Sequence, residues 1–177
     1  MQTIELAILD AIQNLRCGVL DVLMPALSRT ANDGEIWILL AIVLVCIRGQ
    51  RRYGWSVASA LVLDLLTVNI ILKPLIDRVR PCAVNTAVDM LVAAPTSGAF
   101  PSGHTAAAFA VVFALKTAGS PLWKPALAIA IPMAFSRLYL YVHWPTDILG
   151  GILVGAIVGW AGAKIVSLIF ARLSKKA

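Results

Sequence analysis

Charged and polar residues interrupt an otherwise apolar chain in three short segments, and their types are those that handle phosphate groups. The residues are Lys73, Arg80, Ser102, Gly103, His104, Arg137, His143 and Asp147. Lysine and arginine provide positive charge for anionic oxygens, and a guanidinium group can hold two such oxygens at once. Histidine can attack phosphorus or transfer a proton near neutral pH. The three segments therefore have the composition of an anion site that could carry out catalysis.

The two histidines differ in their sequence neighbours. His143 is followed four residues later by Asp147, and Pro145 between them suits the first turn of a helix. A carboxylate one turn away can hold an imidazole in one tautomer and stabilise its charged form, which suits a nucleophile. His104 would then protonate the leaving oxygen and later activate water. A lone histidine is more often a satisfied polar group in a helix cap, so this hypothesis depends on the whole set.

The segment Pro101-Ser102-Gly103 is predicted to open a helix. The free backbone N–H groups and the positive end of the helix dipole would then face a bound anion. Gly103 would let an oxyanion approach the backbone closely, because it has no side chain. Each cation taken alone could instead be an anchor that reaches from the end of a membrane span to water. Three cations together with two histidines favour the anion site.

Metal chemistry finds no support in the sequence. Cys17, Cys46 and Cys82 do not have metal-ligand spacing, and three cysteines cannot all form disulfides with one another. The chain has only two histidines, which excludes a three-histidine zinc site. We therefore expect no metal and no cofactor.

The elements that position these residues are predicted to be membrane helices. The chain has 177 residues, of which 60% are hydrophobic and 14% are charged. Soluble domains contain about 45–50% apolar and about 25% charged residues. A soluble fold of this size could not bury so much apolar surface, and disordered, collagen-like and disulfide-scaffold classes are excluded as well. The net charge of +6 is scattered among apolar runs, which argues against a nucleic-acid partner.

The apolar runs predict an all-α integral membrane protein with a single domain over residues 1–177. Six transmembrane helices are expected near 17–28, 36–47, 55–75, 105–118, 121–140 and 147–173. The first is the least regular, because Asp21 and Pro25 interrupt it. Residues 1–15 are predicted to hold an amphipathic helix on the membrane surface, although Leu6 and Leu9 fall off its apolar face. The alternative for this segment is an extension of the first span.

Basic residues outside the three polar segments indicate the orientation. In a six-span bundle most of them share one side, whereas Arg29 lies on the opposite side. Those on the shared side are Arg16, Arg48, Arg51, Arg52, Lys116, Lys124, Arg172, Lys175 and Lys176. Lysine and arginine concentrate in cytoplasmic loops. We therefore expect an inner cell membrane location with both termini in the cytoplasm, and with the polar segments facing the periplasm or exterior.

Two charged residues, Asp64 and Lys164, fall inside predicted spans at similar depth. A charge near the bilayer centre costs about 2.5–3.5 kcal/mol on insertion scales. We hypothesise that they form an ion pair. The alternative is that Lys164 extends to the interface and Asp64 faces polar neighbours.

At the three polar segments the chain resembles the type 2 phosphatidic acid phosphatase family of membrane lipid phosphatases. The family pattern is K-x6-R-P, then P-S-G-H, then S-R-x5-H-x3-D, and 73–81, 101–104 and 136–147 match it at every fixed position. The resemblance implies metal-independent hydrolysis through a phosphohistidine on His143, with Asp147 orienting it and His104 protonating the leaving group. It also implies a set of residues that hold the phosphoryl oxygens, namely Lys73, Arg80, Ser102, Gly103 and Arg137.

The short chain resembles small bacterial members of the bacitracin-resistance type, which implies undecaprenyl diphosphate as the substrate and the lipid bilayer as a partner. A phosphatase for phosphatidylglycerol phosphate, phosphatidic acid or lipid A is the nearest alternative. An oxidoreductase with vanadate in the same pocket and a transporter that binds anions without turnover are more distant ones. The 82–100 loop contains Met90, Leu91 and Val92, and we hypothesise that it dips into the interface and shapes lipid entry.

Overall fold

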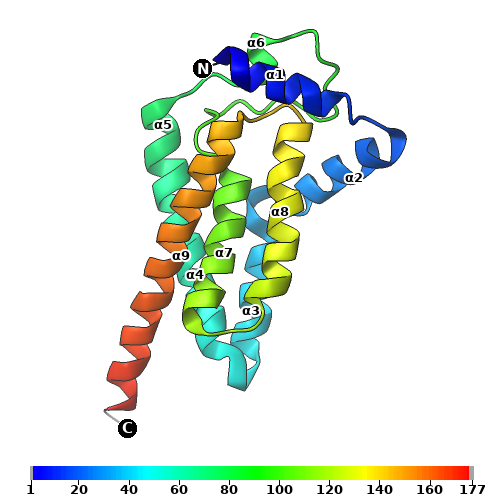
Figure 1. Cartoon of the computed structure of the whole chain (residues 1–177). Coiled ribbons are helices and arrows are strands. Elements are labelled where there is room, and N and C mark those ends of the chain that lie inside the picture. Colours follow the sequence, from blue (N-terminus) through cyan, green and yellow to red (C-terminus); the bar gives the residue numbers. More distant parts are fainter. Residues whose placement is uncertain (1, 176–177) are drawn as a thin grey trace.

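The computed structural model describes residues 2–175, and within them all regular structure is helical (Figure 1). The α-helices are α1 (Gln2–Gln13), α2 (Gly18–Arg29), α3 (Glu35–Cys46), α4 (Arg51–Asp64), α5 (Lys73–Ile76), α6 (Pro81–Val84), α7 (Gly103–Ala118), α8 (Trp123–Tyr139) and α9 (Pro145–Ser174). The short 3-10 helices are η1 (Asn32–Gly34) and η2 (Arg48–Gln50), and η3 (Leu65–Leu72) is a π-helix that continues α4 into α5. The all-α expectation is confirmed.

Helix α7 is the centre of the bundle and packs against α4, α8 and α9 (Figure 1). Every residue from Thr105 to Val112 is buried, as expected of a helix with neighbours on all sides. Small residues of α9 face α7, and a Cβ added to Gly155 would lie 2.5 Å from the carbonyl oxygen of Ala106. The two backbones therefore touch, which is how helices in lipid gain packing contacts. This contact holds the start of α7 beside the start of α9.

Two helical stretches are long and apolar enough to cross a membrane, Arg48–Val84 and Pro145–Ser174. The other bundle helices lie where the sequence predicts them but are shorter than these two stretches, with 12 residues in α3, 16 in α7 and 17 in α8. The expected six spans are therefore not confirmed.

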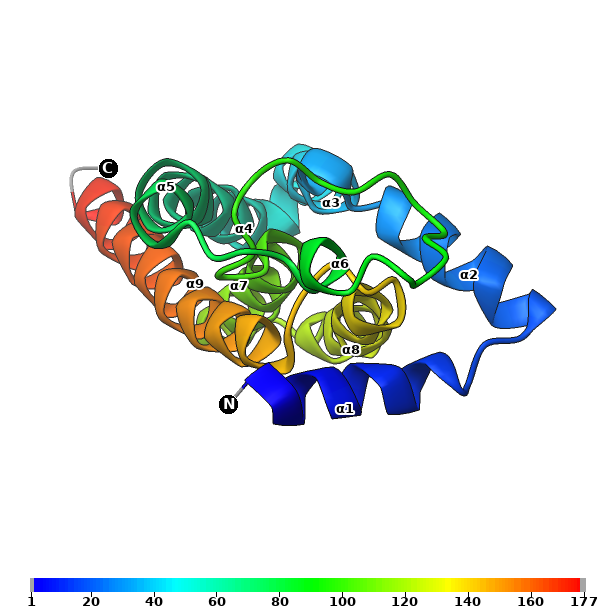
Figure 2. The same cartoon turned by 90° about the horizontal axis from the view of Figure 1, so that it is seen from above.

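Helix α2 departs most from its prediction as the first span. It has 12 residues, carries Asp21 in its first turn and Pro25 in its interior, and lies obliquely beside the end of the bundle (Figures 1 and 2). Asp21 accepts a hydrogen bond from the hydroxyl of Tyr139 at 2.6 Å and pairs with Arg16 at 3.4 Å. These polar contacts keep one side of α2 on the protein, which a lipid-exposed span would not favour.

Because α2 does not cross the bundle, α1 and the end of α9 lie at opposite ends of it. The segments α3, α4 to α5, α7, α8 and α9 run alternately along the bundle, so α1 lies at the end where α9 begins, and α9 finishes at the opposite end (Figure 1). The expectation that both termini share one side is therefore corrected. The physical reason is that α2 does not cross the bundle.

Helix α1 lies across the end of the bundle, as Figure 2 shows from above. Leu9 is completely buried, in a cluster with Ala99, Tyr141 and Trp144. Ile4 and Ile8, on the predicted apolar face, remain 68% and 43% exposed. The helix therefore packs on the protein through a residue that the periodicity placed off its apolar face, and leaves that face free for a membrane surface.

The predicted ion pair between Asp64 and Lys164 is wrong. Asp64 is buried in the bundle, whereas Lys164 is exposed on α9, and no salt bridge joins them among the described residues. Lys164 lies on the outer surface of α9, where its long side chain can reach the interface.

We expect Gly155→Ala to destabilise the protein, because its methyl group would press on the backbone oxygen of Ala106 and force α7 and α9 apart. Overpacking of this kind costs about 1–3 kcal/mol. Gly49→Ala is the matched control, since a Cβ at Gly49 has no atom within 4 Å. Thermal unfolding in detergent measures both variants, and an unchanged midpoint for Gly155→Ala would contradict the close helix contact.

Candidate active site

The three polar segments meet at one end of the bundle, which we call the site end. It is formed where α5 ends and where α7 begins, and by the end of α8 and the start of α9 (Figure 1). A cavity of about 390 Å³ opens there. Six of the eight residues predicted from the sequence line it: Lys73, Arg80, Gly103, His104, Arg137 and His143. The other two, Ser102 and Asp147, are completely buried and are not among the residues that line it.

His143 lies in the loop between α8 and α9, with its side chain pointing both toward Asp147 and toward the cations. Its Nδ1 is 3.4 Å from Oδ2 of Asp147, and its Nε2 is 3.3 Å from Nη1 of Arg80. The 3.4 Å contact is longer than a strong N–H···O hydrogen bond, and such bonds often tighten only when substrate is bound. The geometry suits an imidazole with its proton on Nδ1 and a free electron pair on Nε2.

The ionisation of His143 follows from its surroundings. Burial lowers the pKa of His143 from 6.5 to about 4, and the positive charges of Arg80 and Arg137 act in the same direction. Asp147 opposes them but does not reverse the shift. His143 is therefore neutral at pH 7, the form in which an imidazole can act as a nucleophile.

Arg80 is held by backbone oxygens from two loops. Its Nε donates to the carbonyl of Ser97 at 2.8 Å, Nη1 donates to the carbonyl of Val142 at 2.7 Å, and Nη2 donates to the carbonyl of Gly98 at 3.2 Å. These contacts fix the guanidinium group and tie the 82–100 loop to the loop that carries His143. Val92 of the same loop lines the cavity, while the hypothesis that this loop shapes lipid entry stays a prediction.

The end of α2 reaches into the site from the side. Arg137 donates to the hydroxyl of Ser28, and Nε2 of His104 lies 3.2 Å from the carbonyl oxygen of Ser28. The same Nε2 is 3.2 Å from Oδ1 of Asn32. A carbonyl oxygen can only accept a hydrogen bond, so Nε2 of His104 carries a proton. In the charged imidazolium form, which carries a second proton on Nδ1, His104 can donate this Nε2 proton to a leaving group.

The start of α7 is held against both α9 and Lys73. The backbone N–H of Ser102 donates to the carbonyl of Asp147 at 3.1 Å, and its hydroxyl accepts from Thr105 at 3.0 Å. A Cβ on Gly103 would lie 3.3 Å from Nζ of Lys73. The absent side chain therefore lets the ammonium group approach the positive end of the helix, where both can face a bound anion.

Several residues of the site carry no signal in the sequence. Arg29 and Asn32 line the cavity, and Ser28 holds Arg137 and His104, although all three belong to a segment predicted as a span and the loop after it. Arg78 contacts both Asp147 and Glu5, and 73 positions separate Arg78 from Glu5 in the chain. Only the tertiary structure brings these residues to the site.

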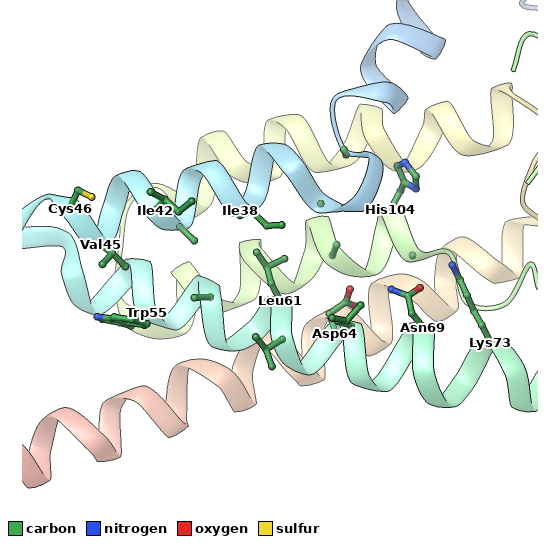
Figure 3. Close-up of a pocket in the computed structure, with 18 residues that line it drawn as sticks. Ile38, Ile42, Val45, Cys46, Trp55, Leu61, Asp64, Asn69, Lys73 and His104 are labelled. Carbon is green, nitrogen blue, oxygen red and sulfur yellow. The ribbon is translucent and has the colours of Figure 1, made fainter. Parts of the chain in front are cut away.

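A second cavity of about 590 Å³ runs between α3 and the α4–η3 segment, and we call it the apolar groove (Figure 3). Its walls include Ile38, Ile42 and Trp55, which are about half exposed along the side of the molecule. The groove meets the polar cavity at three residues that line both: Lys73, Gly103 and His104. The polar cavity and the apolar groove therefore adjoin each other at these three residues.

The family of the chain follows from comparison with known proteins. The model of the PAP2 superfamily matches residues 51–171, which include all three polar segments. The chain belongs to this superfamily. It is 35% identical over 150 residues to the decaprenylphosphoryl-5-phosphoribose phosphatase of Mycolicibacterium smegmatis, an alignment that covers 83% of this chain and 81% of the relative.

Two further proteins extend the comparison. The undecaprenyl-diphosphatase BcrC of Bacillus subtilis is 29% identical over 147 residues, which are 81% of this chain and 73% of that protein. The crystal structure of Aquifex aeolicus LpxE superposes with a TM-score of 0.78 at 28% identity and covers 90% of this chain and 94% of that chain. This chain is thus a phosphate ester hydrolase of the PAP2 type, a lipid phosphatase.

We expect direct titration to find His143 with a pKa near 4, because burial and two neighbouring cations disfavour its charged form. Carbon-13 NMR of labelled histidine in detergent micelles measures this value. The chain has two histidines, so the spectrum of His104→Asn assigns the signal of His143. A titration of His143 at pH 6.5 or above would contradict the described geometry.

Proposed function

We propose that this lipid phosphatase hydrolyses a polyprenyl diphosphate, such as undecaprenyl diphosphate, to the monophosphate. The observation that carries the proposal is the junction of the polar cavity with the apolar groove at Lys73, Gly103 and His104. A substrate that occupies both has a phosphate headgroup and an apolar chain.

The shape of the groove favours a single flexible chain. It lies between α3 and the α4–η3 segment, and its half-exposed walls make it accessible from the side of the molecule (Figure 3). Apolar chains gain little from leaving lipid, so the groove serves to guide the chain rather than to bind it tightly. Two relatives act on polyprenyl-linked phosphates according to their names, which supports the same class of substrate here.

The proposed reaction has two steps, and His143 is the nucleophile in the first. Its Nε2 attacks the terminal phosphorus, and the bond from phosphorus to the bridging oxygen breaks. His104, in the positively charged imidazolium form that the anionic substrate stabilises, gives the proton on its Nε2 to that oxygen and becomes neutral, and the oxygen leaves as part of the lipid monophosphate. The transferred phosphoryl group remains on His143, and the negative charge of Asp147 stabilises the imidazole ring, which now carries a positive charge.

In the second step a water molecule attacks the phosphohistidine. His104, deprotonated after the first step, takes a proton from this water, and the bond from phosphorus to Nε2 breaks. Inorganic phosphate leaves and the neutral His143 is restored. Throughout, Lys73, Arg80 and Arg137 balance the charge on the non-bridging oxygens, aided by the start of α7 at Ser102 and Gly103. Their convergence on one cavity supports this role.

A polyprenyl phosphosugar phosphate is a second candidate substrate. It would place a sugar between the phosphate in the cavity and the chain in the groove. Asn69 and Asp64 line the groove just beyond Lys73, and Oδ1 of Asp64 is buried without a hydrogen-bond partner in the described structure. Such side chains can bind sugar hydroxyl groups. The name of the Mycolicibacterium relative is consistent with this class.

The charge distribution supports a location for the reaction. Basic residues gather at the end of the bundle opposite the site: Arg48, Arg51, Arg52, Lys116, Lys124, Arg172 and Lys175. By the positive-inside rule this end faces the cytoplasm. The site end and α1 then face the periplasm or exterior, in the inner cell membrane, where a polyprenyl carrier is released on the outer leaflet.

We expect His143→Ala to abolish hydrolysis, and His104→Ala to slow it by about 10²–10⁴-fold, because proton transfer to the leaving group is lost. Rapid quench with ³²P-labelled lipid diphosphate in EDTA should trap acid-labile phosphate on the wild type and not on His143→Ala. The loss in His104→Ala should be smaller with p-nitrophenyl phosphate, whose leaving group needs no proton. Full activity in His143→Ala, or a need for added divalent metal, would overturn the mechanism.

We expect Ile42→Trp to raise KM for undecaprenyl diphosphate several-fold, because the indole would narrow the apolar groove. The KM for p-nitrophenyl phosphate, which has no apolar chain, should stay the same. Leu39→Trp is the matched control, since Leu39 lies on the same helix, is 61% exposed and is not among the residues that line the groove.

The same assay compares substrates of the wild type. We expect kcat/KM to be higher for undecaprenyl diphosphate than for phosphatidylglycerol phosphate or phosphatidic acid. Preference for a two-chain lipid would reject the polyprenyl substrate while leaving the mechanism intact. An equal rise of KM in Ile42→Trp and Leu39→Trp would reject the groove as the path of the chain.

A further inference from the structure

A chain of partly buried ion pairs connects α1 to the carboxylate of Asp147. Nη2 of Arg78 is 2.6 Å from Oε2 of Glu5, and Nη1 of Arg78 is 2.6 Å from Oδ1 of Asp147. Glu5 is 4% exposed and Asp147 is fully buried. Pairs of this kind are screened far less than pairs on the surface, so each charge acts strongly on its neighbours.

Further contacts hold Arg78 in this position. Its guanidinium lies over the ring of Trp144, 5.2 Å from the ring centroid, and Nη1 also donates to the hydroxyl of Thr146 at 2.6 Å. The other oxygen of Glu5, Oε1, accepts from the backbone N–H of Thr146 at 3.1 Å and from its hydroxyl at 2.6 Å. Glu5 and Arg78 therefore form one rigid unit with the first turn of α9.

The two oxygens of the Asp147 carboxylate have different partners. Oδ1 faces Arg78, while Oδ2 accepts from the backbone N–H of Trp144 at 2.8 Å and lies 3.4 Å from Nδ1 of His143. With Oδ1 fixed by Arg78, the carboxylate cannot turn Oδ2 away from His143. Arg78 is thus the side chain that orients this carboxylate, together with the backbone N–H of Trp144.

The charges in this series of ion pairs alternate in sign. Glu5 is negative, Arg78 positive and Asp147 negative, and the imidazole of His143 becomes positive when it carries a phosphoryl group. Arg78 without Glu5 would weaken the attraction of Asp147 for the charged imidazole, since opposite charges cancel at a distance. Glu5 offsets the charge of Arg78 and leaves Asp147 with its full effect on His143.

We propose that Arg78 and Glu5 are positioning residues for the reaction: Arg78 fixes the carboxylate of Asp147 toward His143, and Glu5 neutralises Arg78 so that Asp147 can stabilise the phosphorylated imidazole. The inference rests on the proposed roles of His143 and Asp147. It assigns to α1 a part in the chemistry, although that helix contributes no residue to the wall of the cavity.

Helix α1 has other anchors, so the loss of Glu5 need not release it. Leu9 is fully buried, the hydroxyl of Tyr141 donates to Oδ1 of Asp10 at 2.7 Å, and Nε2 of Gln13 donates to the carbonyl of Tyr139 at 3.0 Å. Asp10 does not contact Arg78 or Asp147 in the described structure. Asp10→Asn is therefore a matched control for Glu5→Gln, because both remove one negative charge from the same helix.

The test combines turnover of the lipid diphosphate with the histidine titration by NMR. Arg78→Gln should lower kcat by roughly 10- to 100-fold, the range typical of residues that orient the ligands of a site. It should also raise the pKa of His143 by about one unit, because Asp147 then acts unopposed. Glu5→Gln should lower kcat and shift the pKa of His143 downward. Arg78→Lys, which keeps the charge, should recover part of the activity if Arg78→Gln does not fold.

The other charged groups that act on His143 are unchanged in every variant, and they are Arg80, Arg137, His104 and Asp147. In the double variant Glu5→Gln with Arg78→Gln, the two charge effects should cancel in the pKa, while kcat stays low because the carboxylate is no longer oriented. Asp10→Asn should match the wild type in both measurements.

Each outcome decides between the two levels of the proposal. Trapped phosphate on His143 together with an unmoved pKa in Glu5→Gln and Arg78→Gln would overturn the inference alone. Equal effects of Asp10→Asn and Glu5→Gln would mean that α1 has only a structural role, and this would also overturn the inference. Failure to trap any phosphate on His143 of the wild type would overturn the proposed function first, whatever the variants do.

Discussion

The gathering of positive charge in one cavity is the constraint on which the rest of the site end depends. Lys73, Arg80 and Arg137 line a space of about 390 Å³ in a protein of which 60% of the residues are hydrophobic. Like charges so close repel one another strongly in a medium of low dielectric constant. Fixed oxygens offset that repulsion: loop carbonyls surround Arg80, and the end of α2 supplies Ser28 to Arg137. Loops and helix ends that would otherwise be free to vary are thus held by the cations, and a phosphate group completes the neutralisation.

The apolar part of the bundle supports this site through one backbone contact. The glycine face of α9 lets α7 approach until Gly155 meets the carbonyl of Ala106. The two helices begin side by side, and the N–H of Ser102 reaches the carbonyl of Asp147 at 3.1 Å. His104 on one helix and Asp147 on the other are then fixed relative to each other. Close packing of small residues, which carries no chemistry itself, therefore sets the separation of groups that do.

Local patterns predicted the helices and the eight polar residues, and tertiary contacts account for what they missed. Motif spacing placed Lys73, His104 and His143 at helix ends, because a polar residue at the end of an apolar run has few other places to go. Periodicity failed for α1, where Leu9 packs inward although it falls off the apolar face. Hydropathy also failed for α2, since Asp21 and Pro25 turn an apolar run into an oblique helix. The pairing of Arg78 with Glu5 spans 73 positions, and no local pattern encodes such a contact.

The two faces of helix α1 have different surroundings, because one is exposed and the other packs near Asp147. One face exposes Ile4 and Ile8, which suit the boundary between headgroups and hydrocarbon, and the other buries Glu5 and Leu9 against the protein. A helix in that boundary places the polar cavity at headgroup level and the apolar groove beneath it, so a lipid phosphate can reach Lys73 without leaving the bilayer. Because Glu5 on the buried face contacts Arg78, a displacement of α1 by the membrane would also disturb Asp147. In the proposed mechanism, the same helix therefore meets the lipid with one face and positions Asp147 through the other.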